Sequence, residues 1–531
     1  MIRKYVFMKV RVVVLFVIFG AILLSGCSVN KKKKQDVDTE MVKESVESTS
    51  YIENEETTLC ESTECISDNN ESTHNTENTI NIQNTEDTIN IQNTQTTTRV
   101  EETTKVVVEE TTKIDKSVVI IRDDSWKELK NYSYDKECIK EVIICEGVNK
   151  IIDEAFVDCD NLEKITIANS VKTIGDFAFQ GCEKLTSITI PNEVTSIGRA
   201  AFSCCNGLIS IKLPESVVII GDSAFTSCAN LTSIDMPGVG SIGERAFFEC
   251  ESLKRIEIPN GVMSINKSCF SGCTSLEEVV LPNSIIEINV GAFNDCRSLK
   301  NITIPERVQV IKASTFWNCE SLTNVYMYDN VTEIEEGAFE SCSGLTTITL
   351  SKGLKSIKES AFSDCSSLKK IVLPESLTYI GADAFNQAGL ECIVIPYGVE
   401  KLELRAFNGC YDLESVIFSE GVSNIGQWAF ANCRSLKEII MPNTIVTIGY
   451  GAFQSCDSLI SIEIPEGVTT IEDYAFKACY NLQEIIVPRS VLSIGEDSFQ
   501  TQCGDTKIYG YVGSYLETYM NERNRVFYVI E

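Results

Sequence analysis

Apolar and polar positions follow a pattern that returns every 23 residues over most of the chain. Its clearest marker is a phenylalanine, usually preceded by alanine and followed three residues later by cysteine. The sixteen positions are Phe156, Phe179, Phe202, Phe225, Phe247, Phe270, Phe293, Phe316, Phe339, Phe362, Phe385, Phe407, Phe430, Phe453, Phe476 and Phe499. A fixed period of this length is typical of a solenoid, in which each coil buries its apolar face only against its neighbours.

Residues 171–192 show one repeat unit clearly. Leu185, Ile188 and Ile190 follow an L-x-x-I-x-I spacing whose second half alternates like a β-strand. Val171 and Ile174 indicate a second short extended segment, and we expect the Ala-Phe segment between these elements to form a turn or a short helix. The pattern therefore predicts a β-rich solenoid of about 16 coils of 23 residues with short parallel strands.

Proline and glycine occupy fixed places in the unit. All eleven prolines fall at one repeat position, directly after the strand, where the missing N–H stops the ladder at the same point of each coil. Glycine is frequent at a second position, for example Gly175 and Gly198, but Lys312 and Glu335 also occur there. Glycine is therefore preferred at this position without being required.

With these motifs the units resemble the leucine-rich repeats of BspA-like (Treponema-type) bacterial surface proteins over about residues 139–531. The departures are local, because Tyr328 replaces one of the prolines and residues 386–390 lose one position together with the cysteine. The resemblance implies a leucine-rich repeat fold and adhesion to host or microbial surfaces. It adds a biological role that the spacing alone does not supply.

Both ends of the repeat array carry sequences expected to cap it. At the C-terminal end we assign a small α/β cap to residues 503–531, with a strand over 507–511, a helix from Ser514 to about Asn524 and a closing strand over 526–530. Ser514 and Glu517 have the spacing of a capping box. Segments 118–122 and 125–130 are candidates for the opposite cap, since a solenoid must cover its terminal apolar faces.

The first 26 residues have the composition of an export signal. Four basic residues precede an apolar run from 12 to 24, which is short for a membrane span and ends in Leu24-Ser25-Gly26-Cys27. This ending resembles the lipobox of bacterial lipoproteins, and the resemblance implies a diacylglycerol on Cys27. The alternative is an uncleaved anchor with a chance cysteine. The expected location is the extracellular face of a bacterial membrane.

Residues 27–137 change composition to Thr, Glu, Asn and Ser, with no proline and almost no aromatic residues. Such a segment buries too little apolar surface to compensate for the entropy of ordering, so we expect a disordered stalk. The repeat domain is assigned to 138–531. This division predicts a binding body held away from the membrane by a spacer.

Charge and histidine content exclude several classes of function. The formal net charge is −30, which disfavours nucleic acid as a partner. The only histidine is His74, outside the repeats, so the repeat body lacks an imidazole for general base catalysis or a zinc site. We therefore expect no enzyme activity, no cofactor and no metal, although a catalytic carboxylate pair would escape sequence analysis.

Cysteine occurs at one position of almost every unit. Export favours disulfides, whereas a position between inward phenylalanine and leucine favours a free thiol acting as a small apolar side chain. Neighbouring thiols with parallel side-chain directions fit the disulfide dihedral poorly. We predict that most are reduced. The fourteen ladder positions are Cys159, Cys182, Cys205, Cys228, Cys250, Cys273, Cys296, Cys319, Cys342, Cys365, Cys410, Cys433, Cys456 and Cys479.

Candidate ligand positions lie between the two inward isoleucines of each strand. Four successive coils carry apolar residues there, namely Val372, Val394, Ile417 and Ile440. This stripe is either a partner site or the ordinary preference of β-branched residues for sheets. Trp317, Tyr326 and Tyr328 form a second candidate, suited to sugars or to proteins. We expect macromolecular ligands on a host or microbial surface, with a carbohydrate-binding scaffold for polysaccharide capture as the alternative.

Overall fold

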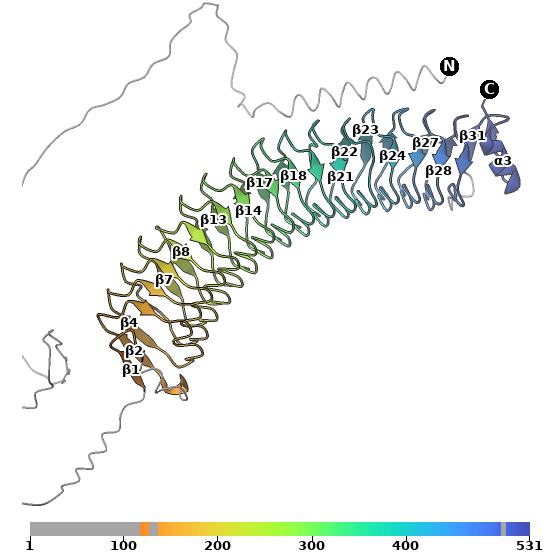
Figure 1. The fold of residues 1–531 in the computed structure, drawn as a ribbon. Helices are drawn as coiled ribbons and strands as arrows, with labels where there is room; N and C mark the ends of the chain where they lie inside the picture. The colour runs from red at the N-terminus through yellow and green to blue at the C-terminus, as the bar shows by residue number, and fades with distance from the viewer. Residues whose placement is uncertain (1–116, 127–135, 501–505, 531) are drawn as a thin grey trace, which may run out of the picture. The chain divides into compact units, whose positions relative to one another are not determined.

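The structure is a computed structural model that describes residues 117–126, 136–500 and 506–530. All of these belong to one unit, Val107–Glu531, within which successive coils lie side by side along a curved stack (Figure 1). The predicted signal peptide at 1–26, Cys27 and most of the stalk lie outside the described residues. No helix in the described ranges is long and apolar enough to cross a bilayer.

Most coils contribute a strand to a ladder built from the L-x-x-I-x-I segment, although no strand is assigned at 185–190 or at 368–374. Partners in this long ladder are one repeat apart, as in Val118↔Glu141 and Glu141↔Lys164. The strands are β1 (Val118–Ile121), β2 (Glu141–Ile144), β4 (Lys164–Ile167), β7 (Ser210–Lys212), β9 (Ser233–Asp235), β11 (Arg255–Glu257), β13 (Glu278–Val280), β15 (Asn301–Thr303), β17 (Asn324–Tyr326), β19 (Thr347–Thr349), β22 (Cys392–Ile395), β23 (Ser415–Phe418), β25 (Glu438–Ile440), β27 (Ser461–Glu463), β29 (Glu484–Ile486), β31 (Lys507–Gly510) and β32 (Tyr528–Val529). The predicted parallel solenoid is confirmed.

A second ladder of two-residue strands comes from the predicted Val/Ile segment and is also parallel. Its register again advances by one repeat, as in Ile151↔Ile174 and Ile174↔Ile197. The strands are β3 (Lys150–Ile151), β5 (Thr173–Ile174), β6 (Ser196–Ile197), β8 (Ile219–Ile220), β10 (Ser241–Ile242), β12 (Ser264–Ile265), β14 (Glu287–Ile288), β16 (Val310–Ile311), β18 (Glu333–Ile334), β20 (Ser356–Ile357), β21 (Tyr379–Ile380), β24 (Asn424–Ile425), β26 (Thr447–Ile448), β28 (Thr470–Ile471) and β30 (Ser493–Ile494).

The third side of each coil is the Ala-Phe segment, and it forms neither a helix nor an ordinary single turn. In the coil of Phe293, Gly291 and Asp295 both have positive φ, at 62° and 60°. The N–H groups of Gly291, Phe293 and Asp295 donate to carbonyls of the next coil at 2.7–3.0 Å. This alternation makes a third inter-coil ladder within a run of consecutive turns, so the predicted turn is confirmed and no short helix forms there.

The sixteen phenylalanines stack in one continuous column through the core. Neighbouring ring centroids are 5.1–6.2 Å apart and the rings are nearly parallel. An edge-on aromatic ring closes each end of the column, with Trp126 against Phe156 and Tyr519 against Phe499, both at 6.1 Å. These two residues cover the terminal apolar faces that a solenoid leaves open.

The C-terminal cap has the predicted strand–helix–strand order, with β31, α3 (Tyr515–Glu522) and β32. The capping-box detail is wrong, because the hydroxyl of Ser514 makes no cap bond and the carboxylate of Glu517 accepts from the N–H of Gly513 at 2.7 Å. At the other end, β1 lies in the segment assigned to the stalk and continues the register of β2. It fits the cap expected over 118–122. A short 3-10 helix, Lys136–Cys138, leads into β2.

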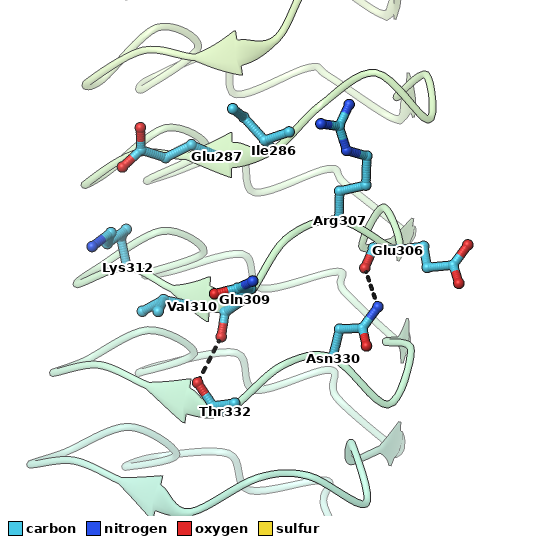
Figure 2. Close-up of a pocket in the computed structure, with 9 residues that line it drawn as sticks. All are labelled: Ile286, Glu287, Glu306, Arg307, Gln309, Val310, Lys312, Asn330 and Thr332. Atoms are coloured by element: carbon cyan, nitrogen blue, oxygen red, sulfur yellow. Dashed lines mark hydrogen bonds between the residues drawn. The ribbon is translucent and has the colours of Figure 1, made fainter.

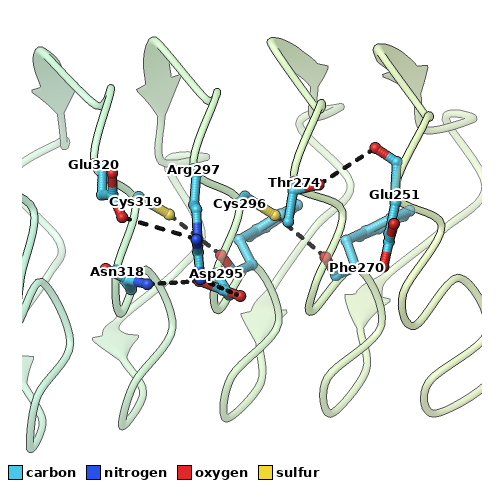
Figure 3. Close-up of polar contacts among 10 residues, drawn as sticks. Glu251, Phe270, Thr274, Asp295, Cys296, Arg297, Asn318, Cys319 and Glu320 are labelled. Carbon is cyan, nitrogen blue, oxygen red and sulfur yellow. Dashed lines mark hydrogen bonds and ion pairs between the residues drawn. The ribbon is translucent and has the colours of Figure 1, made fainter.

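The ladder cysteines are buried free thiols in the described coils. From Cys182 onward each of their thiols donates to the carbonyl of a phenylalanine in the preceding coil. Cys296 donates to the carbonyl of Phe270 at 3.2 Å (Figure 3), and Cys319 donates to that of Phe293 at the same distance. Burial raises the pKa of Cys273 and of Cys342 to about 12. A thiol with a carbonyl partner at each coil supports the prediction that the cysteines are reduced.

Candidate binding surface on the strand ladder

The outward positions of the long ladder form a continuous surface, called here the strand face. In β17, Val325 is buried while Asn324 and Tyr326 are exposed, because alternate residues of a strand point to opposite faces. The same alternation recurs in most of the other strands, for example in β7, β11 and β15. The strand face therefore displays two side chains per coil in register, and their chemistry changes along the solenoid.

The first part of the strand face is charged and self-paired. Lys164 forms an ion pair with Glu141 at 2.6 Å, and Arg255 forms one with Glu278 at 2.5 Å. These pairs join neighbouring coils across the ladder. We define the charged zone by the following residues: Glu141, Lys164, Lys212, Asp235, Arg255, Glu257 and Glu278.

Three consecutive coils then carry no charge at their outward positions. This neutral zone consists of Asn301, Thr303, Asn324, Tyr326, Thr347 and Thr349, which are all exposed, together with Tyr328. Tyr326 lies between Thr303 and Thr349 in register. Its ring meets that of Tyr328 edge to face, with centroids 5.2 Å apart. The structure thus brings two of the three predicted aromatic candidates together.

Trp317, the third aromatic candidate, lies on the third side of its coil and not on the strand face. Its carbonyl accepts from the N–H of Asp295 at 2.7 Å, within the inter-coil ladder of the Phe segments. Its side chain bonds the carboxylate of Glu340, whose pKa is raised mainly by burial and further by the charges of Asp364 and Glu336. The prediction that Trp317 and Tyr326 belong to one candidate site was therefore wrong, because the two residues lie on different sides of the coil.

The apolar zone follows, and it contains the predicted stripe Val372, Val394, Ile417 and Ile440. Val394, Ile417 and Ile440 are direct parallel partners across β22, β23 and β25. Val394 is 47% exposed, Ile417 and Ile440 are partly exposed, and Val372 is 84% exposed. The structure confirms that Val394, Ile417 and Ile440 are neighbours on the outward face, whereas the coil of Val372 has no assigned strand.

The missing residue at 386–390 brings the backbones of two coils close together beside the apolar zone. A Cβ on Gly389 would lie 2.0 Å from the carbonyl oxygen of Ser366, so only glycine fits this close approach. Lys369 bonds Asp412, two coils away, past the shortened coil. Because no strand is assigned in the coil of Val372, the register of β22, β23 and β25 does not extend to Val372.

Sequence analysis missed a row of aromatic side chains on the third side. Tyr450 contacts Trp428 at 4.9 Å and Tyr474 at 5.2 Å between ring centroids, each edge to face. Arg405 lies over the Trp428 ring and Lys477 over the Tyr474 ring. The sequence did contain a signal for this row, since Trp428 and Tyr474 occupy the same repeat position, two residues before the core phenylalanine.

The second ladder carries a shallow hollow of about 780 Å³ (Figure 2). Ile286, Val310 and Lys312 contribute to its lining. Two bonds join coils within it, from Asn330 to the carbonyl of Glu306 and from Thr332 to the carbonyl of Gln309. These bonds satisfy polar groups of the solenoid itself. In the described ranges no cluster of three or more metal-ligating side chains is found.

Comparison with known proteins agrees with this geometry. The model of the BspA type leucine rich repeat region matches residues 127–238, 218–346, 287–413 and 401–510, which together span more than half of the chain. The chain belongs to this family. Such a leucine-rich repeat solenoid is typically a scaffold for binding and not an enzyme.

Several solved structures are similar to this BspA-type chain. A leucine-rich repeat protein from Bacteroides ovatus is 27% identical with a TM-score of 0.44, and the match covers 74% of this chain and 92% of that chain. A leucine rich cell surface protein from Faecalibacterium prausnitzii is 29% identical with a TM-score of 0.33, covering 71% and 89%. The T. pallidum leucine rich repeat protein is 30% identical with a TM-score of 0.30, covering 35% and 85%. A search of curated proteins returned no match.

Proposed function

We propose that this BspA-type protein is a cell-surface lipoprotein that binds a protein on a host or microbial surface through the apolar zone of the strand face. The observation that carries the proposal is the in-register row of Val394, Ile417 and Ile440. Apolar residues at three paired outward positions form a contiguous patch, and such patches mark protein contacts. The charged zone at the other end of the same face keeps the remaining surface soluble.

The family supports surface display, since one relative is described as a cell surface protein. Anchoring through a lipid on Cys27 would place the solenoid outside the cell on its stalk. At about 0.8 kcal/mol per buried methylene, two or more acyl chains hold a protein stably on a membrane. Adhesion is the role that combines these features.

The double substitution Val394→Lys with Ile417→Lys tests the binding site. It places two ammonium groups in the apolar zone, and we expect binding to an array of extracellular matrix and bacterial surface proteins to fall at least about tenfold. The thermal melting temperature should change little, because both side chains point outward. Val280→Lys is the matched control, since Val280 has the same repeat position in β13 and is 36% exposed.

Two results would refute this assignment. One is equal binding by the double variant and the wild type. The other is unfolding of the double variant, which would mean that Val394 and Ile417 contribute to the core. A wild-type protein that binds no protein on the array would refute the proposed function itself.

Cys27→Ser tests the anchor. Without the thiol no diacylglycerol can be attached, so we expect the protein to leave the membrane fraction and appear in the growth medium or in the soluble fraction. Fractionation followed by mass spectrometry of the mature N-terminus measures this directly. A mature chain that still carries Met1 would contradict lipidation.

A further inference from the structure

We propose that the neutral zone of the strand face binds a neutral polysaccharide lying across the coils of β15, β17 and β19. This inference rests on the proposed function only in using the same face, and it assigns a second ligand of different chemistry to a separate set of residues. The polysaccharide site is centred on Tyr326, whereas the protein site is centred on Val394 and Ile417.

The absence of charge is the first argument. The chain has 122 formally charged side chains, 46 basic and 76 acidic, but the neutral zone has none at six outward positions in three consecutive coils. Charged residues resume on either side, at Glu278 and Lys370. A hydroxyl-rich neutral ligand forms hydrogen bonds with such a surface without desolvating an ion, which is the costly part of burying charged groups.

Free hydroxyl groups are the second argument. Among the described residues the hydroxyls of Thr303, Thr349, Tyr326 and Tyr328 have no hydrogen-bond partner in the protein. Each can both donate and accept, as a sugar hydroxyl can. Because Thr303, Tyr326 and Thr349 are in register, their hydroxyl-bearing side chains form a row across three coils.

The neighbouring amides hold this row in a fixed geometry. The side chain of Asn324 donates to Asn301 at 2.8 Å and accepts from the hydroxyl of Thr347 at 2.5 Å. These bonds run across the same three coils, one position earlier in the strand face. A platform whose polar side chains are already ordered loses less entropy when a ligand binds.

The tyrosine pair is the third argument. Tyr326 is 47% exposed, and its ring stands nearly perpendicular to that of Tyr328, at 82°. Edge-to-face packing limits the movement of both rings and leaves ring surface open to solvent. Aromatic faces bind the apolar C–H face of a pyranose ring while adjacent hydroxyls bond its edge. A protein ligand would be expected to use more apolar area than these coils offer.

Binding of the full chain to soluble polysaccharides tests the inference. The probes are three neutral polymers (starch, mannan and β-glucan) and two acidic ones (polygalacturonate and heparin), compared by affinity electrophoresis and calorimetry. We expect retention by at least one neutral polymer and none by the acidic polymers. Retention by none of the neutral polymers would overturn the inference.

Two sets of variants identify the residues. Tyr326→Ala should weaken binding about tenfold, whereas Tyr480→Ala, which removes a tyrosine that is 46% exposed elsewhere, should not. Thr303→Val with Thr349→Val keeps the side-chain shapes and should also weaken binding. Equal binding by Tyr326→Ala and Tyr480→Ala would overturn the site.

The polysaccharide site and the protein site can be refuted independently of each other. The Val394→Lys and Ile417→Lys double variant should keep polysaccharide binding, even if no protein ligand is ever found for the apolar zone. If Tyr326→Ala lowers only protein binding, the neutral zone belongs to the protein site and the polysaccharide inference is wrong.

Discussion

Phe293→Ala is expected to destabilise the middle of the solenoid by about 3–5 kcal/mol. Phe293 is fully buried and stacks between Phe270 and Phe316, with ring centroids at 5.5 and 5.6 Å. Removing the ring opens a cavity that the flanking coils cannot close, because each is held in place by three inter-coil ladders. In a solenoid the loss acts locally, on the coils next to the cavity.

Urea unfolding combined with hydrogen exchange measures this loss and locates it. Phe248→Ala is the control, because Phe248 is partly exposed, lies outside the stack and has Arg245 over its ring. We expect the control to cost about 1 kcal/mol or less. Equal losses for the two variants would show that the phenylalanine column is not the core.

The second large effect is a loss of stability at alkaline pH. Burial raises the pKa of Cys273 and Cys342 to about 12, well above the value near 8.5 of an exposed thiol. The folded state therefore holds the thiol proton more tightly than the unfolded state. The stability from this difference is fully present below about pH 8.5 and is lost as pH rises toward 12.

Each thiol whose pKa is raised by burial contributes a slope of about 1.4 kcal/mol per pH unit in this window, and these contributions add. Urea midpoints at pH 7.5, 8.5 and 9.5 under anaerobic conditions measure it. The triple variant Cys273→Ala, Cys296→Ala and Cys319→Ala should reduce the slope in proportion to the thiols removed, whereas Cys392→Ala, which removes an exposed thiol, should not. Thiol counting on denatured protein should find most cysteines free, and a count near zero would contradict this account.

The repeat period predicted the parts of the fold that depend on apolar positions. Val and Ile at fixed spacing gave both strand ladders, and one phenylalanine per coil gave the core column. These features follow from burial alone, because each inward residue meets its counterpart in the next coil. The contacts of Trp126 and Tyr519 with the ends of this column could be seen only in the structure, since neither residue belongs to the repeat pattern.

The Ala-Phe segment was harder to predict because its conformation depends on bonds to the next coil. Two residues in each of these segments adopt positive φ, a conformation that costs non-glycine residues about 1–2 kcal/mol unless other contacts compensate. Glycine, Asn and Asp at the position two after phenylalanine, as in Gly181, Asn318 and Asp364, were the sequence signal. The hydrogen bonds of the third inter-coil ladder compensate for this cost, so residues other than glycine, Asn and Asp also occur at this position.

Only the part of the candidate site that lies on strands could be predicted from the sequence. Strand alternation placed Val394, Ile417 and Tyr326 on the outward face correctly, since period two fixes the side of each residue. Trp317 was misplaced because it lies in the Ala-Phe segment, where alternation does not apply. The apolar row was predicted from the repeat positions, whereas the ion pairs of the charged zone and the contact between Tyr326 and Tyr328 required the structure.

The most direct test of the central claim compares lysine substitutions on the two sheet faces of the full chain. Val394 on the strand face and Val446, directly before β26 of the second ladder, are similarly exposed, at 47% and 44%. We predict that Val394→Lys loses binding to the protein array, while Val446→Lys keeps it and both variants melt like the wild type. Loss of binding in Val446→Lys with retention in Val394→Lys would contradict the account.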